Sequence, residues 1–236
     1  MTDIKYLKKL ANENRRRIVD LVHFGKSGHP GGSLSIIDML TAIYELDVNF
    51  NSEERSKVVL SKGHTVPALY AVLNSKGIVK GISETEFAPD SSVKREEFVA
   101  MLVRAANLKM KEENKEFTDV PGEAWYKEVI DIAFSNGIIS GRTDGSFGAG
   151  ESITRQDIAV IIGNMLEKGL ISEKEDENKS FNDMAVVYDY ARSSVERVLK
   201  QGIISGYSEG DFRPLNNATR AETAAIIYRI LDRIKG

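Results

Sequence analysis

Apolar and polar positions repeat in one arrangement along three segments of the chain. In each segment two apolar residues stand just after a glycine, as in the string 137–141, and the matching strings are 77–81 and 202–206. A phenylalanine follows the first glycine by ten residues and an arginine follows it by eighteen, in every copy: Phe87, Phe147 and Phe212; Arg95, Arg155 and Arg220. Shared spacing in three copies establishes an internal repeat.

Each copy predicts two helices joined by a polar loop. The first helix is expected to end at the first glycine, because glycine suits the left-handed cap conformation. The phenylalanine is expected to anchor the loop that opens at the second glycine. Thr154 and Thr219 are N-cap candidates for the second helix. The second helices carry apolar residues at helical spacing: Phe98, Leu102 and Ala105; Ile158, Ile162 and Met165; Ala224, Ile227 and Ile230.

The first helix of a copy is clearest in copies two and three. The string 117–120 leads into a helix with Trp125 and Ile130, and the string 181–184 leads into one with Tyr190 and Val195. Segments 109–116 and 170–180 are rich in Lys, Glu, Asn and Asp. Such segments are typical of solvated linkers between units.

These strings together resemble the S-layer homology (SLH) family, whose pattern runs F-x-D-V, W, G-I-I-x-G, D-G-x-F and T-R-A-E. Copy three carries Thr219-Arg220-Ala221-Glu222, and copy two carries Asp144-Gly145-Ser146-Phe147 and Thr154-Arg155-Gln156-Asp157. Copy one has only its second half, with Lys94-Arg95-Glu96-Glu97 in place of T-R-A-E. The resemblance covers about residues 77–236. It implies three lobes packed about a pseudo-threefold axis.

The resemblance also implies a function and a site. SLH modules anchor bacterial surface proteins to secondary cell-wall polysaccharide, often pyruvylated, and the arginine of T-R-A-E is the family's ligand residue. A guanidinium pairs well with a carboxylate. The alternative is that each arginine only pairs with a neighbouring carboxylate. Trp125 is interpreted as a core or groove-wall residue, with stacking on a sugar as the alternative. The candidate glycan-binding residues are Arg95, Arg155, Arg220, Trp125, Asp144, Gly141 and Gly206.

The first 76 residues follow another pattern. Apolar residues at helical spacing predict helices within 3–24 and 34–46, which could form a hairpin. The strings Gly28-His29-Pro30-Gly31 and Ser61-Lys62-Gly63-His64 resemble the start of a transketolase N-terminal domain. In that family the first histidine lies at the substrate channel and the second lies near the thiamine diphosphate phosphates.

The resemblance to transketolase is incomplete. The G-D-G…N segment that holds Mg²⁺ and diphosphate does not follow, and thiamine chemistry needs the cofactor held at both ends. We therefore interpret His29 and His64 as relics, expect neither catalysis nor a cofactor, and expect no metal site from the histidines.

One segment of this part could serve the repeat. Counted back from each repeat glycine, apolar residues recur at minus eleven, minus seven and minus four: Val66, Tyr70 and Leu73; Tyr126, Ile130 and Ala133; Ala191, Val195 and Val198. These offsets trace one face of a helix. Our hypothesis is that residues 65–76 act as the missing first helix of lobe one.

The sequence therefore predicts an all-α protein, a pseudo-threefold SLH-like three-lobed helical spindle with an N-terminal helical extension. Residues 1–63 form a transketolase-like helical segment. Residues 64–109 form a hybrid first SLH-like unit, and residues 110–170 and 171–236 form units two and three.

Composition and charge narrow the partners. The net charge is −3, which does not favour nucleic acid, and no apolar run is long enough for a membrane span. With 0 cysteines, disulfides and thiolate sites are excluded. Basic residues interrupt the first segment, so no signal peptide is visible; the resemblance implies a cell-wall location, whereas the chain as written is expected in the cytoplasm. Exposed N-terminal helices would favour a homodimer.

We favour a non-catalytic module that anchors to pyruvylated cell-wall polysaccharide. Two alternatives stay open: a recombination chimera without retained function, and an inactive fragment of a thiamine diphosphate enzyme.

Overall fold

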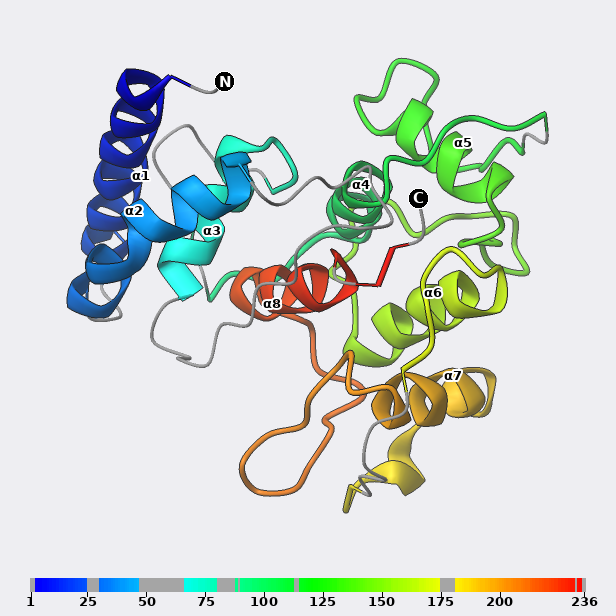
Figure 1. Cartoon of the computed structure of the whole chain (residues 1–236). Helices are drawn as coiled ribbons and strands as arrows, with labels where there is room; N and C mark the ends of the chain where they lie inside the picture. The colour runs from blue at the N-terminus through cyan, green and yellow to red at the C-terminus, as the bar shows by residue number, and fades with distance from the viewer. Residues whose placement is uncertain are drawn as a thin grey trace. The chain divides into compact units, whose positions relative to one another are not determined.

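The computed structural model describes residues 3–24, 30–46, 66–79, 88, 90–112, 115–174, 181–231 and 233–234. Within these ranges the regular structure is helical and no β-strand forms (Figure 1), which confirms the all-α prediction. The chain divides into two compact units. Residues 1–91 and 220–225, with Gly236, form the first, and residues 92–219 and 226–235 form the second.

Three helices build the first unit: α1 (Ile4–Phe24), α2 (Pro30–Leu46) and α3 (Val66–Ser75). They pack against one another in pairs, so the predicted helical hairpin is confirmed. Asn14 Nδ2 donates to Thr41 Oγ1 at 3.0 Å in the buried seam between α1 and α2. The second helix begins at Pro30, before the expected 34, because proline suits the first helical position.

The end of α3 follows the repeat pattern. Gly77 has φ +70°, and Ile78 N donates to Leu73 O at 3.0 Å. The corresponding bonds join Ile138 N to Ala133 O at 3.1 Å and Ile203 N to Val198 O at 3.2 Å. All three predicted glycine caps are confirmed, since Gly137 and Gly202 also have positive φ.

The second unit contains α4 (Arg95–Ala105), α5 (Lys127–Ser135), α6 (Arg155–Glu167), the short η2 (Met184–Val186), α7 (Asp189–Lys200) and the later residues of α8 (Arg220–Leu231). Helix α4 packs on α5 and α6 packs on α7. The three repeat arginines each stand at the first position of a helix, as predicted. All nine apolar residues predicted for the second helices are buried.

A closed ring of backbone hydrogen bonds links the three copies. Val93 N donates to Ala218 O at 3.0 Å, Ala218 N donates to Ile153 O at 3.0 Å, and Ile153 N donates to Val93 O at 2.9 Å. Each of these residues stands two positions before a repeat arginine. The ring therefore has the pseudo-threefold symmetry that the repeat implied.

The expected linkers are only partly solvated. Most described residues of 109–116 are exposed, but Ile171 is buried and forms a β-bridge with Ile234. The expectation for 170–180 is therefore wrong at Ile171, because this apolar side chain gains more from burial than the polar residues around it.

Candidate functional site

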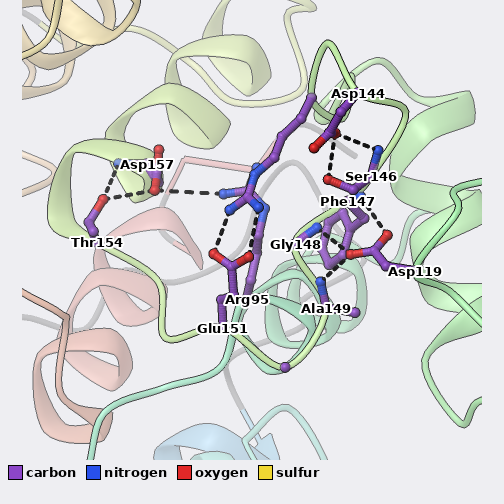
Figure 2. Close-up of polar contacts among 12 residues, drawn as sticks. Arg95, Asp119, Asp144, Ser146, Phe147, Gly148, Ala149, Glu151, Thr154 and Asp157 are labelled. Carbon is purple, nitrogen blue, oxygen red and sulfur yellow. Dashed lines mark hydrogen bonds and ion pairs between the residues drawn. The ribbon is translucent and has the colours of Figure 1, made fainter.

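The loop of copy two is organised by a carboxylate. Asp119 Oδ1 accepts from Phe147 N at 2.7 Å, and Asp119 Oδ2 accepts from Gly148 N and Ala149 N, each at 2.7 Å (Figure 2). Burial acts to raise the pKa of Asp119, but the three backbone N–H groups outweigh it and lower the pKa below the usual value. Because Phe147 is fully buried beneath this loop, its predicted anchoring role is confirmed.

Copy three repeats the arrangement. Asp183 Oδ1 accepts from Phe212 N at 2.8 Å, and Asp183 Oδ2 accepts from Arg213 N at 2.6 Å. Phe212 is fully buried as well. The sequence analysis missed the function of these two aspartates, although the repeated F-x-D string was the signal that could have identified it.

Gly141 and Gly206, two candidate glycan-binding residues, lie under aromatic rings. A Cβ atom at Gly141 would overlap Cε1 of Phe117, and one at Gly206 would overlap Cε1 of Phe181. Gly141 also has φ +77°. Both glycines thus have a packing requirement of their own, while their contact with a glycan stays a prediction.

Arg155 is deeply buried, with 3% of its surface exposed. Its Nε donates to Phe212 O at 2.8 Å and its Nη2 donates to Ser205 O at 2.7 Å. The guanidinium carbon also lies 5.1 Å from the Phe212 ring centroid and 4.8 Å from that of Tyr207. Arg155 therefore ties the start of α6 to the loop of copy three.

Arg95 occupies the equivalent place against copy two but makes fewer bonds. Its guanidinium carbon lies 5.2 Å from the Phe147 ring centroid, and 15% of its side chain is exposed. Its Nη1 lies 3.9 Å from Asp157 Oδ2, and its buried Nε has no hydrogen-bond partner among the described residues (Figure 2). Burial lowers the pKa of Arg95, and the charge of Asp157 opposes this shift.

Arg220 is 4% exposed, and its backbone N donates to Ser91 O at 3.0 Å. Its side chain forms a hydrogen bond with Tyr70 of α3. Burial raises the pKa of Tyr70, and the Arg220 charge acts against that shift. The bond supports the hypothesis that residues 65–76 act as the first helix of lobe one; that hypothesis and the proposed domain boundaries stay predictions.

Tyr190 and Asp157 form a further polar cluster beside Arg95. The Tyr190 hydroxyl donates to Asp157 Oδ1 at 2.8 Å and accepts from Gln156 Nε2 at 3.1 Å. Burial of this hydroxyl, and then its bond to Asp157, raise the pKa of Tyr190. The sequence analysis did not select Tyr190 as a site residue, although it stands twelve residues before the repeat glycine, as Trp125 does.

Trp125 and Asp144 lie at the surface. Trp125 is 60% exposed and meets Tyr126 edge-on, with ring centroids 5.4 Å apart. The interpretation of Trp125 as a core residue is therefore wrong, because it precedes α5 and turns its indole outward. Asp144 Oδ1 accepts from both N and Oγ of Ser146, and these bonds lower the pKa of Asp144. Its predicted glycan contact is untested.

Several predicted features lie outside the described residues, namely His29, His64, Phe87 and Val58–Leu60. In the part of the chain that is described, no group of three His, Cys, Asp or Glu side chains could hold a metal ion. No described helix is both long and apolar enough to cross a membrane. Exposed apolar residues on α1 and α2 include Ile4, Val19 and Met39, but the predicted homodimer is untested.

Comparison with known families agrees with two origins for the chain. Residues 116–159 and 180–224 match the S-layer homology domain. Residues 7–87 match the transketolase, thiamine diphosphate binding domain. The transketolase match continues past residue 76 into the first repeat string, so the two resemblances overlap there.

Individual relatives divide in the same way. An amylopullulanase from Thermoanaerobacterium thermosulfurigenes is 35% identical over 81% of this chain and 10% of its own length. A cellulosome-anchoring protein from Acetivibrio thermocellus is 29% identical over 66% of this chain and 35% of its own. An apulose-4-phosphate transketolase from Phocaeicola vulgatus, one chain of a split enzyme, is 38% identical over 32% of this chain and 29% of its own.

The chain thus spans about a third or less of the length of these curated relatives. Its N-terminal match is to a part of the transketolase domain, and its later matches are to repeats with the ring and loop geometry described above. The chain joins a transketolase-like N-terminal segment to S-layer homology repeats.

Proposed function

We propose that this chain is a non-catalytic binding module that anchors to bacterial secondary cell-wall polysaccharide through its repeat arginines. The observation that carries the proposal is the backbone ring of Val93, Ile153 and Ala218, which joins the three copies just before their arginines. This arrangement repeats one cationic side chain about one axis. A polymer with repeated anionic groups is a fitting ligand for such an array, because several contacts add avidity.

The chemistry favours a carboxylate on the glycan. A planar guanidinium can donate two parallel hydrogen bonds to a carboxylate such as a pyruvyl ketal. One such contact contributes about 1.5–3 kcal/mol. The matches to S-layer homology repeats and to a cellulosome-anchoring protein support a cell-surface setting for the chain, in preference to the cytoplasm.

The N-terminal segment is proposed to have no catalytic activity. Its match ends at residue 87, and the diphosphate-binding G-D-G…N string is absent from the sequence that follows. A cofactor gripped at one end only would not be activated. We propose that this segment instead contributes α3 to the first lobe.

The proposal is tested by co-sedimentation of the purified chain with bacterial cell walls. Walls with pyruvylated polysaccharide are compared with the same walls after mild acid has removed the ketal. Binding to the first and weak binding to the second is the expected result. A chain that is folded by circular dichroism but stays in the supernatant with both walls would contradict the proposal and favour a chimera without retained function.

A further inference from the structure

Two arginines at the same repeat position are satisfied to different degrees. Arg155 donates two hydrogen bonds below 3 Å to backbone carbonyls and is 3% exposed. Arg95 has a buried Nε without a partner among the described residues, and its contact with Asp157 is 3.9 Å long. A largely buried charged group with unfilled donors is costly for the protein alone. An anionic ligand could remove part of that cost.

Two exposed aromatic rings lie next to the same carboxylate. Tyr188 is 54% exposed and Tyr190 is 59% exposed, with ring centroids 6.1 Å apart. Both are held through Gln156, which donates to the Tyr190 hydroxyl and accepts from Tyr188 N at 3.2 Å. Rings fixed in this way offer a contact face with little conformational entropy left to lose.

Asp157 connects the rings to the arginine. Its Oδ1 accepts from the Tyr190 hydroxyl, and its Oδ2 accepts from Thr154 Oγ1 at 2.8 Å and faces Arg95 (Figure 2). Arg95 and Tyr190 are close enough for the charge of one to affect the pKa of the other. A cation, an acceptor and an apolar face therefore stand together within the second unit.

We propose that these four residues, Arg95, Asp157, Tyr188 and Tyr190, form the principal site for an acidic sugar, here called the Arg95 site. The sugar carboxylate pairs with Arg95, and a pyranose ring packs on Tyr190 and Tyr188. Arg155, at the same repeat position, is a structural residue. This assignment rests on the proposed function, and it adds two tyrosines that the repeat arginine motif does not contain.

The test measures affinity by isothermal titration calorimetry. The probe is purified pyruvylated cell-wall polysaccharide, and the same material without its ketal is the reference. Arg95→Lys keeps the charge but loses the planar fork, and Tyr190→Ala removes the ring. Each is expected to weaken binding about tenfold, which corresponds to about 1.4 kcal/mol. Tyr190→Phe, which keeps the ring, is expected to lose about twofold.

Two control variants separate binding from folding. Tyr6→Ala removes an exposed tyrosine of α1 and is expected to leave the affinity unchanged. Arg155→Lys is expected to lower the melting temperature while the folded protein keeps its affinity. Loss of binding in Arg155→Lys with an unchanged melting temperature would overturn the assignment.

The two proposals fail in different ways. If the wild-type chain binds neither polysaccharide, the proposed function itself is wrong. If the wild type binds the pyruvylated form and both Arg95→Lys and Tyr190→Ala bind it equally well, only the Arg95 site is wrong. Equal binding of the two polysaccharides by the wild type would overturn the pairing of Arg95 with a carboxylate.

Discussion

The loops of copies two and three receive arginines from the same repeat position but hold them differently. In copy three the loop offers carbonyls of Phe212 and Ser205 to Arg155. In copy two the loop offers Arg95 the face of Phe147, and Arg95 turns toward Asp157. One repeated residue can therefore stabilise the fold in one place and stay available to a ligand in another.

The largest test of this comparison replaces each arginine by methionine, which keeps much of the side-chain volume. Arg155→Met leaves two buried carbonyls without their donor and is expected to lower the free energy of unfolding by about 3 kcal/mol. Arg95→Met removes a contact of 3.9 Å with Asp157 and is expected to cost about 1 kcal/mol or less. Urea unfolding measures both, and equal losses would break the comparison.

The glycines that open these loops give the next largest effect. Gly206→Ala and Gly141→Ala place a methyl group against Phe181 and Phe117, and each is expected to cost about 2 kcal/mol. Gly122→Ala is the matched control, because no atom lies within 4 Å of its added Cβ. Thermal unfolding distinguishes them. If both loop variants melt with Gly122→Ala, the rings do not constrain the loops as described.

The aspartate under the copy-two loop gives a pH-dependent effect. Asp119→Asn loses charge-assisted bonds to three backbone N–H groups, and at pH 7 it is expected to lower the free energy of unfolding by about 1.5 kcal/mol. Because folding lowers the pKa of Asp119 below 3.8, its contribution is complete above that value and is lost as the pH falls through the lower folded-state pKa.

The difference between wild type and Asp119→Asn should accordingly stay constant from pH 7 to about 5 and shrink below about 4. Chemical unfolding at a series of pH values measures it. A difference that grows on acidification would show that Asp119 is not held as an anion by the loop.

The smallest effect is expected at the surface of the same loop. Arg142 Nη2 lies 2.5 Å from Glu151 Oε2, and the two side chains are 43% and 55% exposed. Arg142→Ala is expected to lower the free energy of unfolding by about 0.5 kcal/mol, since solvent screens exposed pairs. High salt should remove most of that difference in the same unfolding measurement. A loss as large as that of Asp119→Asn would mean that the pair positions the loop.

The sequence was informative where a local rule decides the structure. Glycine caps, helix starts at the arginines and buried phenylalanines follow from spacing and backbone preference, and the positions of Gly77, Arg155 and Phe212 confirm them. The predicted helices of the N-terminal segment formed for the same reason. Periodicity placed their apolar faces, and only the start of α2 was misplaced, by four residues.

The site was less predictable, because it depends on contacts between copies. The sequence placed Arg95, Arg155 and Arg220 at one offset, yet their hydrogen-bond partners come from other segments and differ. Trp125 matched a family position but is turned outward, whereas Tyr190 at the same offset gains Asp157 and Gln156 as partners. Side-chain satisfaction of this kind is a tertiary property that spacing alone does not encode.

The backbone ring of Val93, Ile153 and Ala218 also constrains the order of events during synthesis. Each bond joins residues from different copies, so the ring cannot close until the last of the three has been made. Contacts this distant in sequence slow folding, because the intervening chain must be ordered first. On a ribosome that adds about 5–20 residues per second, the earlier copies wait for the third with their ring positions unpaired.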